Sequence, residues 1–211
     1  MNHWFKKVIQ LVLFTSISGA NAGAYEDFFK AVELDDGRVI TQLLGRGFDV
    51  NSPSESGQTA LFLALRGGAH QAVAALLSAP DLKVDQVNEA NETALMMAAL
   101  RGHLTWCKRL VERGAAVNRA GWTPLHYAAT GPEPQVVSFL LASGAKVDAA
   151  SPNGTTPLMM AARYGQEDSV QLLLGARADP RLRNQKDLSA ADFARDAGRQ
   201  ALASRLDLLS R

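Results

Sequence analysis

Hydrophobic and polar stretches alternate along most of the chain with a period of about 33 residues. Short segments that read Thr-Ala-Leu or Thr-Pro-Leu begin at Thr59, Thr93, Thr123 and Thr156, and a weaker copy begins at Ser189, so the spacings are 34, 30, 33 and 33 residues. Small residues, a glycine and a leucine-rich stretch with helical spacing follow most of these starts. A period of this length, held over several copies, indicates a stack of similar units.

Each copy predicts two helices joined by a turn. The threonine hydroxyl can cap the free N–H groups of the first helix, and proline suits its first position. The leucine-rich stretch predicts the second helix, and Gly114 and Gly144 fit the left-handed residue that ends it. The polar link to the next copy predicts an extended β-turn finger, with Asn153 and Gly154 as its turn signal. One such unit cannot bury its own apolar face, so neighbouring units must stack.

Two copies carry a recognisable signature, TPLHYAA at 123–129 and TPLMMAA at 156–162. From Tyr25 to about Leu209 the chain resembles an ankyrin repeat protein. The resemblance implies an all-α repeat solenoid of stacked ankyrin helix-turn-helix units with β-turn fingers, in one domain over 23–211. About six units are expected: an N-terminal cap at 25–51, four central units at 52–85, 86–118, 119–148 and 149–180, and a C-terminal cap at 181–211.

The first 22 residues differ from the repeats and have the three parts of a secretory signal peptide. Lys6 and Lys7 give a positive start, a mostly apolar run follows at 8–18, and Ala20-Asn21-Ala22 is an A-x-A site. We expect residues 1–22 to be removed, with cleavage after Ala24 as the other option; an uncleaved anchor or a first helix is the alternative. The chain is therefore expected in the periplasm, or secreted, without stable membrane insertion after cleavage.

Composition and motifs give no indication of an enzyme. The formal net charge is +1, which offers no basic patch for nucleic acid. The single cysteine, Cys107, excludes an internal disulfide and a two-cysteine metal site. No catalytic motif is present, so no catalytic, cofactor-binding or metal-binding residue is expected. For His126 and His103 the resemblance implies hydrogen bonds to the backbone that brace the stack.

The repeat is interrupted at places where a partner could be recognised. Asn118 stands five residues before Thr123, whereas Asn51 stands eight before Thr59, so the finger at this point must be short. Trp122 lies on it and is a candidate anchor for a partner, or it fills the gap between neighbouring fingers. At the second helix end of the fifth unit, arginine 177 replaces the glycine of other units, which costs about 1–2 kcal/mol if the backbone there is left-handed.

The resemblance implies a concave groove built from finger tips and the ends of first helices. Met97, Tyr127 and Met160 would form a semi-exposed apolar column, although such a stripe is more often core. Arg66, Arg101 and Arg163 would form a basic row facing an acidic or mixed partner, unless they are merely solvated helix ends. The candidate partner-binding residues are Arg66, Met97, Arg101, Trp122, Tyr127, Met160, Arg163 and Tyr164. Further groove residues are Glu55, Gln58, Glu92, Leu100, Thr130, Asn153 and Thr155.

These observations predict a monomeric protein-protein interaction module. In the first hypothesis it binds or protects a periplasmic protein through the groove. The alternative is an inhibitor or immunity protein that neutralises a secreted toxin or hydrolase by blocking its active site. The partner is another protein in both cases, and no cofactor is implied.

Overall fold

The chain forms a row of paired helices. The structure is a computed structural model and describes residues 19–210, so most of the predicted signal peptide lies outside the described residues. Within the described range the regular elements are all α-helices, and the only β feature is an isolated bridge between Pro53 and Thr59. No helix of this range is long and apolar enough to cross a membrane.

The helices form six consecutive pairs in residues 19–210. Each pair has a first helix, a turn and a second helix, and a loop leads to the next pair. The first helices are α2 (Gly19–Glu33), α4 (Ala60–Gly67), α6 (Ala94–Leu100), α8 (Pro124–Thr130), α10 (Pro157–Tyr164) and α12 (Ala190–Asp196). The second helices are α3 (Gly37–Gly45), α5 (His70–Leu77), α7 (Leu104–Glu112), α9 (Pro134–Ala142), α11 (Glu167–Gly175) and α13 (Gln200–Leu209).

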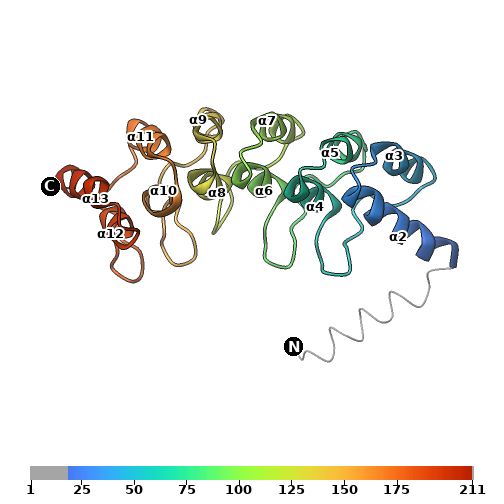
Figure 1. Cartoon of the computed structure of the whole chain (residues 1–211), viewed down its shortest axis with the longest axis horizontal. Coiled ribbons are helices and arrows are strands. Elements are labelled where there is room, and N and C mark those ends of the chain that lie inside the picture. Colours follow the sequence, from blue (N-terminus) through green and yellow to red (C-terminus); the bar gives the residue numbers. More distant parts are fainter. Residues whose placement is uncertain (1–18, 211) are drawn as a thin grey trace, which may run out of the picture.

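Figure 1 shows the first and second helices in two rows, with the fingers projecting beyond the row of first helices. Neighbouring first helices pack directly on each other, from α2 and α4 through to α10 and α12. The chain therefore has the stacked architecture that the repeat predicted. The loop before α8 stops short of the other fingers, as the missing residues before Thr123 predicted (Figure 1).

The predicted helix starts are confirmed by hydrogen bonds. The Thr59 hydroxyl accepts the Phe62 amide at 3.1 Å, and Ser189 accepts the Asp192 amide at 3.3 Å. Thr156 does the same for Met159 at 3.4 Å. Because these hydroxyls supply acceptors to otherwise unpaired amides, the helices α4, α10 and α12 each begin at a fixed residue.

The ends of second helices also match the local rules. Gly114 and Gly144 have φ of 89° and 85°, in the left-handed region that glycine adopts without strain. Arg177 occupies the corresponding place with φ of 67°, so the predicted non-glycine residue in this conformation is confirmed.

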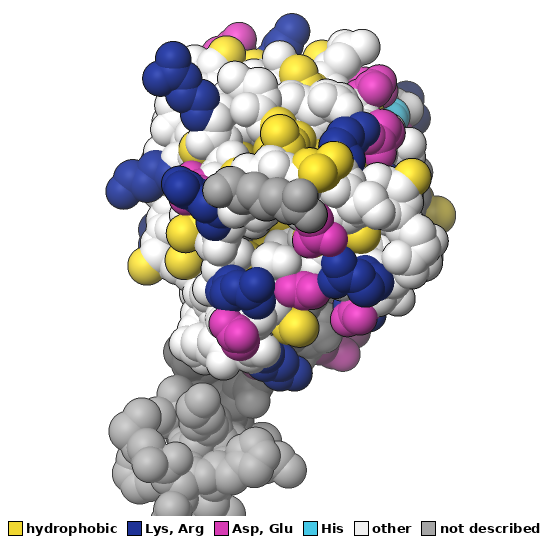
Figure 2. All heavy atoms as spheres, turned by 90° about the vertical axis from the view of Figure 1, so that its left-hand side faces the viewer, with side chains coloured by type: hydrophobic (Ala, Val, Ile, Leu, Met, Phe, Trp, Pro, Cys, Tyr) yellow, Lys and Arg dark blue, Asp and Glu magenta, His cyan; other side chains and the backbone are white. Residues whose placement is uncertain are grey.

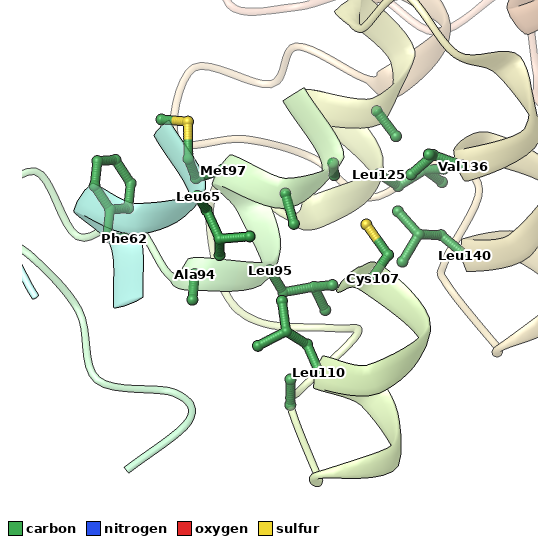
Figure 3. Close-up of a cluster of buried hydrophobic side chains, with 14 of the residues drawn as sticks. Phe62, Leu65, Ala94, Leu95, Met97, Cys107, Leu110, Leu125, Val136 and Leu140 are labelled. Atoms are coloured by element: carbon green, nitrogen blue, oxygen red, sulfur yellow. The ribbon is translucent and has the colours of Figure 1, made fainter. Parts of the chain in front are cut away.

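The core runs through the stack between the two rows of helices. Paired alanines in the first helices, such as Ala128 and Ala129, are fully buried and let successive units approach closely. Burial raises the pKa of the Cys107 thiol to about 12, so this cysteine is a core residue and not a reactive one. Figure 3 shows one section of this core, to which α6, α7, α8 and α9 contribute Leu95, Cys107, Leu110, Leu125, Val136 and Leu140.

A ladder of side chains links the units behind the fingers. An asparagine or aspartate before each central finger accepts a backbone amide of the next unit, so it satisfies a loop amide and fixes the spacing of the units. The four pairs are Asn51 with Lys83 at 2.8 Å, Asp85 with Ala116 at 3.0 Å, Asn118 with Lys146 at 2.8 Å, and Asp148 with Asp179 at 3.1 Å.

The C-terminal end of the stack is covered by charged side chains. Figure 2 faces this end and shows basic and acidic groups interspersed on it. Arg195 pairs with Asp192 at 2.6 Å and with Asp207 at 2.8 Å, and Arg205 pairs with Glu167. Within residues 19–210 the sixth unit has no neighbour on its outer side, and this polar cover keeps that side compatible with water.

Candidate functional site

An apolar hollow of about 300 Å³ opens between three consecutive first helices. Its walls come from α6, α8 and α10 and from the short finger that precedes α8. The hollow therefore lies beside the point where the row of fingers is interrupted. The lining residues are Leu100, Trp122, His126, Tyr127, Thr130 and Met160. We refer to these six residues as the notch pocket.

The short finger places Trp122 at the pocket. Gly121 has φ of 79°, and this left-handed residue turns the chain directly before Trp122. The indole lies edge-on to the His126 ring, with centroids 5.1 Å apart and planes at 74°. Because Trp122 is only partly buried, its apolar surface is available in the notch pocket.

His126 fixes the floor of the notch pocket. Its Nδ1 lies 3.1 Å from the Thr123 amide and 2.9 Å from the Thr123 hydroxyl, and its Nε2 lies 2.9 Å from the carbonyl oxygen of Thr155. An Nδ1 that accepts from an amide leaves the ring proton on Nε2, which donates across to the next finger. The side chain is fully buried, and desolvation lowers its pKa despite the Thr155 hydrogen bond. The neutral ring braces two units, as the resemblance implied.

The Tyr127 hydroxyl is held by a carboxylate of the finger that precedes α6. Its hydroxyl donates to Glu92 at 2.8 Å, and the other Glu92 oxygen accepts from the Asn88 side chain at 2.9 Å. Burial, followed by the hydrogen bond to Glu92, raises the pKa of the Tyr127 hydroxyl far above its usual range. The phenol therefore stays protonated, and one edge of the notch pocket is fixed in orientation.

The structure brings several of the predicted groove residues together, but two others, Met97 and Thr155, are buried. Trp122, Tyr127 and Met160 line the notch pocket with the further predictions Leu100 and Thr130. Met97 is only 7% exposed, so the predicted column lacks its first member. Figure 3 shows Met97 lying against α4, beside Phe62 and Leu65, where it joins the apolar core.

Thr155, which was expected in the groove, is buried. The Ser151 hydroxyl accepts the Thr155 amide at 3.1 Å, and the Thr155 carbonyl accepts from Nε2 of His126 at 2.9 Å. The backbone of this finger thus links neighbouring units, and the Thr155 side chain is not exposed to solvent.

The predicted basic row is uneven. Arg66 and Arg101 are exposed, and no carboxylate of residues 19–210 forms an ion pair with either. Arg163 instead meets Asp196 of the next unit at 3.4 Å and stacks over Tyr164 at 5.4 Å. Tyr164 itself is 61% exposed, which is unusual for a large aromatic side chain.

A second cluster was not predicted from the sequence. Trp106 donates its indole N–H to His70 Nδ1 at 2.8 Å, and the His103 ring lies 5.5 Å from that of His70. These residues border a hollow of about 430 Å³ at the starts of α7 and α9. The available signal was the separation of the two histidines, 33 residues, which places them at equivalent points of adjacent units. In the part of the chain that the structure describes, no group of three or more potential metal ligands occurs.

Comparison with known proteins agrees with the repeat architecture. The family model for ankyrin repeats in three copies matches residues 28–120 and 116–184. Neurogenic locus notch homolog protein 4 of Homo sapiens is 47% identical over 92 residues, 42% of this chain. Ankyrin repeat and KH domain-containing protein mask-1 of Caenorhabditis elegans is 30% identical over 174 residues, 74% of this chain. The chain spans 5% and 7% of the lengths of these two relatives.

A solved structure matches over a much larger share of its own length. It is described as the predatory endopeptidase Bd0816 of Bdellovibrio bacteriovorus in complex with immunity protein Bd3460. The similarity has a TM-score of 0.73 and 28% sequence identity, and it covers 86% of this chain and 97% of the matched chain. With the family match over more than half of the residues, the chain belongs to the ankyrin repeat family of protein-binding modules.

Proposed function

We propose that this chain is an immunity-type inhibitor, which binds an exported hydrolase and holds it inactive. The observation that carries the proposal is the near-complete match to a chain in the complex of an endopeptidase with an immunity protein, at 97% of that chain. A shared isolated repeat would match only part of each chain, whereas this match extends over nearly the whole stack. At 28% identity the two surfaces differ, so the target is proposed as a hydrolase and not as that particular endopeptidase.

The notch pocket supplies a binding site of suitable chemistry. Trp122, Tyr127 and Met160 present apolar surface in a hollow of about 300 Å³, which has room for one bulky side chain of a partner. Tryptophan and tyrosine are the residue types that contribute most at protein interfaces. Because His126 and Glu92 hold the surrounding rings in place, little side-chain freedom is lost on binding.

Charge at the edge of the groove favours an acidic partner surface. Arg66 and Arg101 are exposed, and neither is neutralised by a carboxylate within residues 19–210. Opposite charge on a partner accelerates association and fixes its orientation. Exposed Tyr164, stacked with Arg163, extends the same surface toward the C-terminal units.

Location outside the cytoplasm is part of the proposal. The signal-peptide pattern at residues 1–22 supports export, and a periplasmic hydrolase is then the accessible target. A protein that only holds or protects a periplasmic partner is the second candidate. The charged and apolar groove supports it equally, but the likeness to an endopeptidase–immunity complex favours inhibition.

Crosslinking in the native envelope, followed by mass spectrometry, would identify the partner. The captured protein would then be purified and its activity measured with increasing amounts of the chain. We expect stoichiometric inhibition, weakened about tenfold or more by Trp122→Ala. Leu208→Ala, an exposed apolar residue on α13, is the matched control and should inhibit like the unmodified protein. If the captured partner keeps full activity in the presence of the chain and only becomes more stable, the chain protects its partner and does not inhibit it.

A further inference from the structure

We propose that His70, Trp106 and His103 form a proton-sensitive joint between the second and third units, which loosens on acidification. The joint lies outside the notch pocket and is independent of the identity of the partner. His70 is the first residue of α5, His103 immediately precedes α7, and Trp106 lies in the first turn of α7. The three side chains thus connect the second helices of adjacent units.

The joint spans a weak point in the stack. The second helices α3 and α5, α7 and α9, and α9 and α11 pack closely on each other, whereas α5 and α7 pack less closely. The first helices α4 and α6 of the same two units remain in contact. The bridge between α5 and α7 therefore joins two second helices whose own packing is loose, as that of α11 and α13 also is, and it acts together with the Arg113 side chain, which donates to the Ala79 carbonyl at 2.9 Å.

The bridge requires a neutral imidazole. The Trp106 indole N–H can only donate, and it donates to His70 Nδ1 at 2.8 Å. The two rings are also stacked, with planes at 19° and centroids 5.9 Å apart. A protonated His70 carries N–H on both nitrogens, so the indole N–H would lose its acceptor and would face another donor.

A positive charge already lies beside the joint. The Arg109 guanidinium lies 5.1 Å from the centroid of the Trp106 ring. No ion pair joins a carboxylate of residues 19–210 to His70 or His103. One carboxylate oxygen of Asp35 accepts the Ala72 amide at 2.8 Å, so this nearby acid is already hydrogen-bonded to the backbone. The charged residues on the elements packed against the joint, and at their ends, are Asp35, Asp36, Arg38, Arg66, Arg101, Lys108, Arg109, Glu112 and Glu133.

His103 acts in the same direction. Its Nε2 is buried and has no hydrogen-bond partner in the described structure, so a proton there would be a buried, unpaired charge. Desolvation, followed by the nearby His70, lowers the pKa of His103. Because burial opposes a proton on His103, protonation of His70 is the event that removes the bridge, and the joint between α5 and α7 then opens while α4 and α6 stay packed. The stack then bends at this position.

The first test follows the indole N–H resonance of Trp106 by heteronuclear NMR, assigned by its loss in Trp106→Phe. From about pH 8 to about pH 5, we expect it to shift away from a hydrogen-bonded position and to exchange faster with water. His70→Gln is the matched variant, because a glutamine carbonyl can accept from the indole but does not titrate. The transition should be lost in His70→Gln. A Trp106 resonance that does not change with pH, or that changes identically in His70→Gln, would overturn the proposal.

The second test measures the joint itself. Spin labels at Ser78→Cys, the residue that caps the end of α5, and at Glu112→Cys, the last residue of α7, in a Cys107→Ala background, report the separation of the two helices by electron–electron double resonance. Both labelled positions are exposed. We expect the distance distribution to shift to longer values and broaden at about pH 5, and to remain unchanged in His70→Gln. A distribution that is the same at both pH values would show that the joint does not open.

Discussion

The guanidinium of Arg199 lies 3.0 Å from the carbonyl oxygen of Gly165, the residue that caps the end of α10. The same nitrogen donates to the carbonyls of Ala161 and Ala162 at 2.9 and 3.0 Å. A side chain of the sixth unit therefore binds three carbonyls at the end of a helix, where backbone partners run out, although the Ala161 carbonyl also accepts from the Gly165 amide. Its charge also interacts favourably with the negative end of the helix dipole. This contact joins the C-terminal cap to the fifth unit.

Arg199→Ala should lower the free energy of unfolding by about 2–3 kcal/mol, because charge-assisted hydrogen bonds to partly buried carbonyls are lost. Urea unfolding followed by circular dichroism measures the change. Arg195→Ala is the matched control, since Arg195 pairs only with acids at the surface and such pairs contribute little. Equal losses in the two variants would contradict the capping role of Arg199.

Gly165 is required by close packing and not by its dihedral angles. Its backbone is extended, with φ of −85° and ψ of 172°, but a Cβ built there would lie 2.1 Å from the Ala129 carbonyl oxygen. Gly165→Ala should therefore destabilise the stack by about 1–3 kcal/mol, as overpacked positions do. Gly175→Ala, where nothing lies within 4 Å, should be neutral or stabilising by about 0.5–1 kcal/mol. Thermal and urea unfolding of the pair would check this, and two similar values would refute the steric argument.

The fold could be predicted from the sequence because it depends on local rules repeated at a fixed period. The threonine caps, the left-handed Gly114 and the short finger at Trp122 all follow from residue type and spacing. The period also placed Tyr127 and Met160 at corresponding positions of adjacent units, with Trp122 on the short finger just before α8, and the structure brings these three side chains together.

What the sequence did not reveal depends on contacts between particular side chains of neighbouring units. Met97 was expected to be semi-exposed, but it is buried, and Phe62 and Leu65 of α4 lie beside it. Arg163 was expected in the basic row along the groove, but Asp196 of the next unit pairs with it. The His70–Trp106 bridge likewise depends on rotamers, although the 33-residue period indicates which units it joins.

An exchange of residues at the helix ends tests the cost of the left-handed arginine. Arg177 has φ of 67° and Gly114 has φ of 89° at the corresponding place. Gly114→Arg should cost about 1–2 kcal/mol in the free energy of unfolding, because a side chain in this conformation is strained. Arg177→Gly should stabilise by at most about 1 kcal/mol, since relief of strain is partly offset by the greater freedom of glycine in the unfolded chain. A loss of stability in Arg177→Gly would mean that Arg177 makes a compensating contact.

Two methionines at corresponding positions distinguish core from binding surface. Met97 is 7% exposed, whereas Met160 is partly exposed and lines the notch pocket. Met97→Ala should lower the free energy of unfolding by about 2–4 kcal/mol, as removal of a buried side chain leaves a cavity. Met160→Ala should cost clearly less stability but weaken binding of the captured partner. Unfolding curves and a binding titration of both variants would separate the effects, and the reverse pattern would contradict the assignment.

Acidification should destabilise the stack through its buried histidines. Burial lowers the pKa of His126 below that of the unfolded chain, so the unfolded state takes up a proton more readily than the folded state does. Stability is then fully present above the unfolded value of about 6.5 and falls as the pH decreases below it. His103 contributes with the same sign.

Urea midpoints between about pH 8 and about pH 5 should fall for the unmodified chain and fall less steeply for His126→Gln. The variant starts from a lower stability because its bridge to Thr155 is altered. Midpoints that rise on acidification, or slopes that are equal in the two proteins, would show that His126 is not held neutral by burial.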